Sequence, residues 1–205
     1  MRLRPSGAAG LLVSSLGAFR RYQEGEAWTW EHQALVRARV LVGCERVAGA
    51  FAEVRTAVLA RERDQAKLQA EVSEMRAKMR DNLGSRATAA GTAANAFDAA
   101  SPFDLKQDAG GIVDIEFMVQ YAALAWSKQH PALLEFTDNI RILEGLDRLG
   151  LLRDGEASLL QDAYKAYRSA AHRQALQKQP GVVGGDQFHE HRRNVMRIWR
   201  ELGLS

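Results

Sequence analysis

Cysteine is almost absent from this 205-residue sequence: Cys44 is the single example, so no intrachain disulfide can form. A lone cysteine fits a reducing compartment, and the simplest interpretation of Cys44 is a small buried residue of a helix. No apolar run approaches the length of a membrane span, and the first residues lack the apolar core of a secretion signal. These absences predict a cytoplasmic protein that does not bind a membrane.

An excess of charge is also absent, since the formal net charge is only +3. No basic stripe with interleaved aromatic residues is present, so no nucleic acid partner is expected. His189 and His191 flank Glu190, but no cysteine lies nearby and no histidine pair has the i, i+4 spacing of a helical metal site. We therefore expect no metal ligands here, and we expect these histidines to face solvent or to lie at a helix end.

What the sequence does contain is helical periodicity, with apolar residues three or four positions apart in most segments. Cap residues and glycines divide these segments into separate helices. The predicted helices start at Ser15, at Ala27, after Gly43, at Asp64, after Gly111, at Thr137 or Asp138, at Asp154 and after the loop 181–185. The sequence therefore predicts a mainly α fold.

Two of these helices carry further predictions. The helix that starts at Ala27 is expected to continue as far as Leu41, and core packing is the preferred interpretation of Trp28 and Trp30. In the helix that starts at Asp64, Glu74 and Lys78 can pair across one turn beside an apolar stripe.

The segment 84–101 is rich in alanine and small polar residues and has almost nothing large to bury. We predict a flexible insert there, because so little apolar area cannot offset the entropy of ordering it. Residues 103–106 follow as a short extended piece.

Gly110 and Gly111 stand at the start of a helix that is apolar on nearly all sides, and such a helix belongs in the middle of a bundle. Its first turns contain Asp114 and Glu116. We expect these acids to cap the helix or to pair with an arginine such as Arg39 or Arg141. A bound phosphate at this helix start is less favoured, because two acids oppose an anion.

The first residues, 1–4, are typical of the end of a β-strand, and Pro5 followed by Ser6 and Gly7 ends it. With a period of two, Arg2 and Arg4 share the polar face, where an anionic substrate could sit. The alternative is that one of them forms a salt bridge with a carboxylate outside this sequence. No strand-forming sequence precedes residue 1, so the chain is expected to begin in the middle of a domain.

Three motifs in order resemble a known family: Arg-Leu-Arg-Pro-Ser-Gly (2–7), Trp-Thr-Trp-Glu-His-Gln-Ala-Leu-Val-Arg-Ala-Arg (28–39) and Gly-Gly-Ile-Val-Asp-Ile-Glu-Phe (110–117). The sequence resembles the C-terminal, adenylyltransferase part of the bifunctional glutamine synthetase adenylyltransferase/adenylyl-removing enzymes. The resemblance implies a C-terminal helical bundle, 61–205, attached to the terminal remnant of a nucleotidyltransferase α/β domain, 1–60.

The resemblance also implies a function. Enzymes of this family transfer AMP from ATP to a tyrosine of glutamine synthetase with Mg²⁺ neutralising charge, and their other half removes it, under control of the PII signalling protein and glutamine. The family's three metal-binding aspartates are not in this sequence, and the third would immediately precede Met1. We therefore expect no catalytic residue here, no AMP transfer by the chain alone, and a need for the N-terminal remainder of the enzyme.

By the same resemblance, Arg2, Arg4 and Ser6 are expected close to the phosphates, with support from Glu31, Arg37 and Arg39. Two other interpretations stay open. The chain could be a stand-alone helical adaptor or regulatory protein-binding domain without catalysis, although an adaptor has no need for the strand-end motif at 2–7. It could also belong to a related nucleotidyltransferase that modifies another protein.

Overall fold

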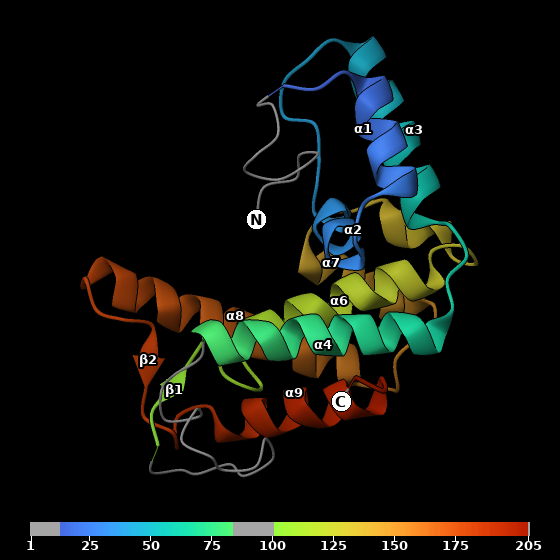
Figure 1. The fold of residues 1–205 in the computed structure, drawn as a ribbon. Helices are drawn as coiled ribbons and strands as arrows, with labels where there is room; N and C mark the ends of the chain where they lie inside the picture. The colour runs from blue at the N-terminus through green and yellow to red at the C-terminus, as the bar shows by residue number, and fades with distance from the viewer. Residues whose placement is uncertain (1–12, 84–100, 205) are drawn as a thin grey trace.

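The computed structural model describes residues 13–83 and 101–204, and within these ranges the chain is mainly helical, as predicted (Figure 1). The elements in order are α1 (Leu16–Gly25), α2 (Thr29–Val36), α3 (Glu45–Leu59), α4 (Gln65–Leu83), β1 (Phe103–Asp104), α6 (Ile112–Trp126), the 3-10 helix η2 (Pro131–Leu134), α7 (Asn139–Arg148), α8 (Glu156–Leu176), β2 (Val182–Val183) and α9 (His189–Glu201). The predicted strand end at 1–4 and nearly all of the predicted insert, 84–101, lie outside the described residues.

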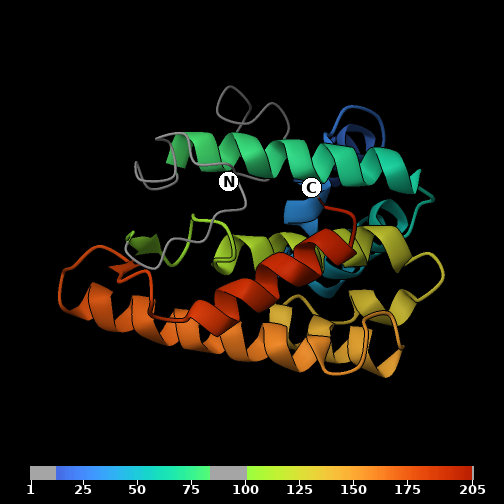
Figure 2. The same cartoon turned by 90° about the horizontal axis from the view of Figure 1, so that it is seen from below.

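Helix α6 is the centre of the bundle, which confirms the prediction from its apolar sequence. It packs against α2, α4, α7, α8 and α9, and Figure 2 shows it between α4 on one side and α8 on the other. Most of its side chains are buried, including Ile115, Phe117, Met118, Val119, Tyr121 and Leu124. A helix buried all round in this way fixes the positions of the helices that cover it.

Helices α1 and α3 lie side by side and extend away from the bundle (Figure 1). The Phe19 and Phe51 rings stack between them with their centroids 5.8 Å apart. Only the C-terminal part of α3 enters the core, through Val54, Val58 and Leu59. The pair is therefore attached to the bundle at one end.

Local cap chemistry places several helix starts where the sequence predicted them. The side chain of Ser15 accepts a hydrogen bond from the backbone N–H of Ala18, and Asp64 accepts one from Lys67 at 2.7 Å. Of the two candidates for α7, Asp138 is the cap, with a 3.0 Å bond from the N–H of Arg141. These side chains satisfy N–H groups that the first turn leaves unpaired.

The prediction that Asp154 starts α8 is wrong, since the helix begins at Glu156. Gly155 has φ of 79°, a conformation that glycine adopts readily, and the Glu156 carboxylate accepts a 3.1 Å hydrogen bond from the N–H of Arg153. The capping carboxylate thus lies inside the helix and reaches back to the loop.

Helix α2 begins at Thr29 rather than at the predicted Ala27, and it ends at Val36 without continuing to Leu41. The buried guanidinium of Arg55 donates to the carbonyl oxygens of Leu35 at 3.2 Å and Val36 at 2.8 Å. It also donates to the carbonyl of Leu134 at 2.8 Å. Because a side chain from α3 satisfies these carbonyls, the helix can stop without a glycine.

Two predicted core residues are exposed. Trp28 leaves 70% of its surface in solvent, and Cys44 is exposed as well. Both residues directly precede a helix, Trp28 before α2 and Cys44 before α3. A side chain at that position lies outside the buried face, and the apolar periodicity of the following helix does not apply to it.

The two short strands pair antiparallel, with Phe103 opposite Val183. Residues 182–183 were predicted as part of a loop, so the prediction is wrong there. Phe103 is buried against the ring of Tyr167, with the centroids 5.7 Å apart. The pairing joins residues far apart in sequence, and no local pattern at 182–183 indicates it.

The central position of α6 leads to a stability prediction. Phe117→Ala should lower the free energy of unfolding of this chain by about 3 to 5 kcal/mol, because it empties a buried aromatic site. Urea unfolding measures the change, and Leu176→Ala is the matched control, since Leu176 is largely exposed. Unfolding of Phe117→Ala like the parent would show that the side chain does not support the core.

Candidate functional site

The predicted site residues differ in position and in exposure to solvent. Arg2, Arg4 and Ser6 lie outside the described residues. Glu31 lies in the first turn of α2, and Arg37 directly follows the last turn. Arg39 is exposed in the connection to α3.

Arg37 joins α2 to the centre of the bundle. Its Nη1 atom donates to Oδ1 of Asn139 at 2.8 Å and lies 3.6 Å from Oε1 of Glu116. One turn earlier in α2, Nε2 of Gln33 donates to Oε1 of Gln120 at 3.4 Å. We call these five residues the α2–α6 junction.

The junction is polar but largely shielded from solvent. Gln33 and Asn139 are buried, whereas Arg37 and Glu116 are half-buried. The hydroxyl of Tyr164 on α8 also donates to Glu116, at 3.4 Å. Such partly buried contacts are screened less than surface ion pairs, and each depends on a specific geometry.

Both acids at the start of α6 pair with an arginine, as predicted, but the partners are Arg37 and Arg76 rather than Arg39 or Arg141. Arg141 instead pairs with Asp138, the cap of its own helix, at 2.6 Å. The short distance along α7 explains this choice. Glu116 pairs with Arg37, and Asp114 pairs with Arg76.

The Arg76–Asp114 pair was missed by the sequence analysis and is completely buried. Nε of Arg76 lies 2.5 Å from Oδ1 of Asp114, and Nη2 donates to the carbonyl of Gln107 at 2.7 Å. The other carboxylate oxygen accepts a 2.7 Å bond from the N–H of Gly110. Burial lowers the pKa of Arg76, and the nearby carboxylate opposes that shift. The available signal was the spacing of Arg76, four residues after the core residue Val72.

Glu31 joins α1 to α2. Its buried carboxylate accepts hydrogen bonds from the Tyr22 hydroxyl at 2.9 Å and from the N–H of Trp28 at 3.0 Å. It therefore caps the start of α2 and holds the end of α1. A role in supporting phosphate-binding groups stays a prediction.

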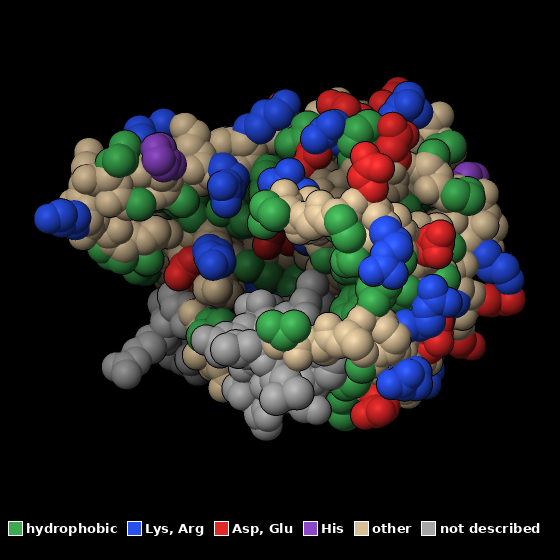
Figure 3. Space-filling model, turned by 90° about the horizontal axis from the view of Figure 1, so that it is seen from above, with side chains coloured by type: hydrophobic (Ala, Val, Ile, Leu, Met, Phe, Trp, Pro, Cys, Tyr) green, Lys and Arg blue, Asp and Glu red, His purple; other side chains and the backbone are tan. Residues whose placement is uncertain are grey.

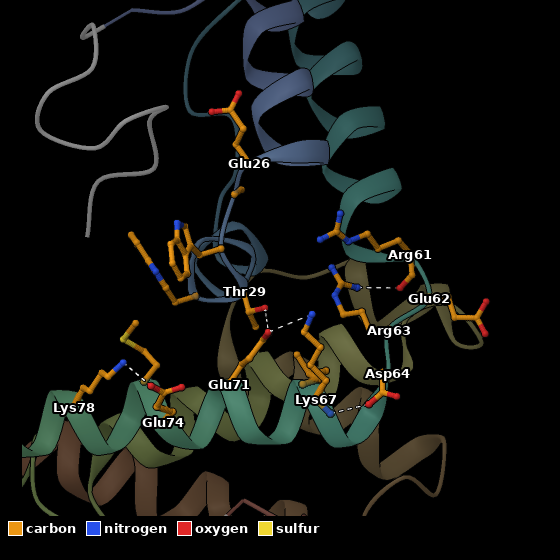
Figure 4. A pocket seen from close by; sticks show the side chains of 15 residues that line it. Glu26, Thr29, Arg61, Glu62, Arg63, Asp64, Lys67, Glu71, Glu74 and Lys78 are labelled. Atoms are coloured by element: carbon orange, nitrogen blue, oxygen red, sulfur yellow. Dashed lines mark hydrogen bonds and ion pairs between the residues drawn. The ribbon is translucent and has the colours of Figure 1, made fainter.

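A cleft of about 790 Å³ lies between α2 and α4 (Figure 4). It is lined by residues 26–30, residues 61–64 and one face of α4 comprising Lys67, Leu68, Glu71, Glu74, Met75 and Lys78. Trp28 borders it with most of its ring exposed. The cleft is open and carries charges of both signs.

Each cation of the cleft already has a partner. Lys78 pairs with Glu74 at 2.6 Å, as the sequence predicted, and Lys67 lies 3.9 Å from Glu71. Glu71 also accepts a short hydrogen bond from the hydroxyl of Thr29.

The two arginines of the cleft are similarly engaged. Arg63 donates to backbone carbonyls, including those of Leu59 at 2.7 Å and Val58 at 2.8 Å, and Arg61 contacts His32. The cleft is thus a mixed polar surface and not a concentrated positive site for a triphosphate.

His32 lies behind the cleft and is buried. Its Nε2 atom is 2.9 Å from the carbonyl oxygen of Gln23, and its Nδ1 atom is 3.3 Å from Nη2 of Arg61. Because the carbonyl only accepts and the guanidinium only donates, this geometry requires the neutral ring with the proton on Nε2. Burial, with Arg61 and Arg63 nearby, lowers the pKa of His32 to about 4.

Within the described residues, no three histidine, cysteine, aspartate or glutamate side chains come together as metal ligands. His189 is the first residue of α9, in agreement with the predicted helix end. His191 is half-buried against the rings of Tyr167 and Phe188. Among residues 13–83 and 101–204, no helix has the length and apolar character needed to cross a membrane.

Two family models match this chain. A model described as glutamate-ammonia ligase adenylyltransferase matches residues 1–54, and one described as GlnD PII-uridylyltransferase matches residues 73–181. Both descriptions name nucleotidyltransferases. The α2–α6 junction joins the two matched regions, because Gln33 and Arg37 lie in the first and their partners in the second.

Curated relatives identify the family more closely. The chain is 78% identical over its full length to the bifunctional glutamine synthetase adenylyltransferase/adenylyl-removing enzyme of Pseudomonas syringae pv. tomato, and 76% identical to that of Pseudomonas aeruginosa. The enzyme of the same name from Hahella chejuensis is 49% identical over 98% of the chain. The chain belongs to this family, and it spans 20 to 21% of the length of these relatives.

The buried neutral histidine predicts a pH dependence of stability. The unfolded chain takes up a proton at His32 below about pH 6.5, whereas the folded chain does so only near pH 4. Stability from this residue is therefore complete above pH 6.5 and is lost as the pH falls, by about 2 kcal/mol between pH 7 and pH 5.

Urea unfolding at several pH values measures this effect. His32→Gln removes the titrating group, so its free energy of unfolding should change less over the same pH range than that of the parent. Equal pH dependence of the two proteins would contradict the assignment.

Proposed function

We propose that this chain is the helical part of an enzyme that transfers AMP from ATP to a tyrosine of glutamine synthetase and, through its other half, removes it. The α2–α6 junction is the observation that carries the proposal. The names of the relatives state both activities. Through the junction, the helical bundle contacts the region that the adenylyltransferase model matches.

The junction supports a scaffolding role. Arg37 and Gln33 belong to the region matched by the adenylyltransferase model, and Glu116, Gln120 and Asn139 belong to the bundle. Polar contacts of this kind hold only one register, so they orient the first region as well as attach it. In this proposal, residues 1–60 complete the nucleotidyltransferase domain and residues 61–205 form the bundle that holds it.

The chemistry itself is assigned to groups outside the described residues. The carboxylates of the described part do not assemble into a metal site, so we propose that Mg²⁺ and ATP are held by the remainder of the enzyme. Arg2, Arg4 and Ser6 are proposed to lie close to the phosphates, because the arginine fork suits a phosphate oxygen pair. Arg37 would support them through the junction, and the exposed Arg39 would remain available to an anion.

The partners follow from the same proposal. In this proposal glutamine synthetase is the substrate protein and the PII signalling protein is the regulator. The remainder of the same enzyme is covalently linked to this chain. The proposed compartment is the cytoplasm.

The direct test compares the isolated chain with a longer chimera. In the chimera, this chain replaces the matching 205 residues of the Pseudomonas syringae relative. With Mg²⁺ and ATP labelled at the α-phosphate, the chimera should transfer label to glutamine synthetase, whereas the isolated chain should give only background. Transfer by the isolated chain, or none by the chimera, would contradict the proposal.

The phosphate role of the N-terminal arginines has its own test in the chimera. Arg2→Ala or Arg4→Ala should reduce AMP transfer by roughly 10- to 150-fold, the loss expected when a charge-assisted contact of about 1.5 to 3 kcal/mol is removed. Arg193→Ala is the control, because Arg193 is exposed on α9. Kinetics for ATP like those of the control would show that neither arginine positions the phosphates.

A further inference from the structure

The outer end of the α1–α3 pair carries an exposed apolar patch. Val13 is 83% exposed, Leu41 is 78% exposed and Val42 is 95% exposed, and Val40 and Val47 are exposed beside them in sequence. We call these five residues the outer patch. They lie just before α1 or around the start of α3, and Figure 1 shows both helices beginning at the end remote from the bundle.

This end of the molecule receives little support from the rest of the described chain. Gln23 is the one buried side chain of α1, and the buried side chains of α3 begin at Val54. The Phe19–Phe51 stack packs the two helices against each other and leaves the outer patch uncovered. Seen from above in Figure 3, hydrophobic side chains lie among charged ones on this face.

A group of exposed aliphatic side chains is unlike the single exposed apolar residues that are normal on a surface. The exposed Glu45 and Arg46 lie in sequence between Val42 and Val47 of the outer patch. Apolar and charged side chains are mixed in the same way in non-obligate protein interfaces, which as a whole are about as apolar as the rest of the surface.

We propose that the outer patch is the surface on which the remaining part of the longer enzyme docks. This inference rests on the proposed function, in which the chain works as one part of that enzyme. The chain spans 21% of the relative from Pseudomonas syringae, so most of such a polypeptide lies outside these residues.

Two observations favour this occupant. The patch lies entirely within residues 1–54, the region that the adenylyltransferase model matches. A covalently linked partner also acts at a high effective concentration, which favours it over a second copy that must be captured from solution.

Cys44 provides a probe at the site itself. It is exposed, lies two residues after Val42, and is the single cysteine of this chain. The experiment measures the rate of maleimide labelling of Cys44, by mass spectrometry of its peptide, in the isolated chain and in the chimera. Labelling should be at least 10-fold slower in the chimera, and equally fast in both proteins after unfolding in urea.

Leu41→Asp separates docking from an unrelated loss of reactivity. In the chimera it should return Cys44 to the labelling rate of the isolated chain, whereas Leu176→Asp should leave the labelling slow, because Leu176 is exposed at the far end of α8. In the isolated chain, Leu41→Asp should leave urea unfolding unchanged. A second chimera built on the Pseudomonas aeruginosa relative covers the case in which the first does not fold.

The outcomes distinguish this inference from the proposed function. Rapid labelling of Cys44 in a folded chimera that transfers AMP would overturn the docking surface alone. Slow labelling in a chimera that transfers no AMP would support docking and contradict the proposed activity. A dimer of the isolated chain that protects Cys44 and is abolished by Leu41→Asp would assign the patch to a second copy, and the inference would be wrong.

Discussion

The buried ion pair between Arg76 and Asp114 is the contact on which the arrangement of the bundle depends. Removing two charges from water is costly, and further hydrogen bonds to the paired groups offset part of that cost. Here the Gln107 carbonyl and the Gly110 N–H supply two such bonds, whereas Nη1 of Arg76 is buried without a hydrogen-bond partner among the described residues. A Cβ atom on the neighbouring Gly111 would lie 2.8 Å from the carbonyl oxygen of Leu105, so the turn that delivers Asp114 requires glycine. The pair fixes the start of α6, and the central helix fixes the others.

Arginines perform a related task at two other places in the fold. Arg55 satisfies carbonyls at the end of α2, and Arg63 satisfies carbonyls at the end of α3. The partial negative charge of a helix C-terminus makes a cation a favourable partner there. Burial lowers the pKa of Arg63 to about 10, which still leaves it protonated near neutral pH. Both helices can thus end at a defined residue without the glycine that commonly follows the last turn of a helix.

The parts of the fold that could be predicted from sequence are those governed by local rules. Cap residues located α1, α4 and α7, because each cap accepts a hydrogen bond from a backbone N–H three residues further on. The apolar sequence that follows two glycines located α6, which has no side-chain cap. The pairing of β1 with β2 and the end of α2 depend on residues distant in sequence, and no local pattern encodes them. For the candidate site, sequence singled out Arg37 and Glu116 separately. It could not match them, just as it could not match Gln33 with Gln120, which are 87 residues apart.

Helix α2 connects α1 to the bundle, because polar contacts hold it at both ends. Glu31 and His32 attach its first turns to α1 and to the loop before α4, through Tyr22 and Arg61. Arg37 attaches its last turn to α6 and α7. Apolar packing tolerates small sliding movements, whereas a hydrogen bond weakens steeply when its length or angle changes. A displacement of α6 would therefore either break the junction or carry α2 with it. In the second case α1, which is bound to α2 through Glu31, would move as well. The contacts of α2 thus link the helical bundle to the region matched by the adenylyltransferase model.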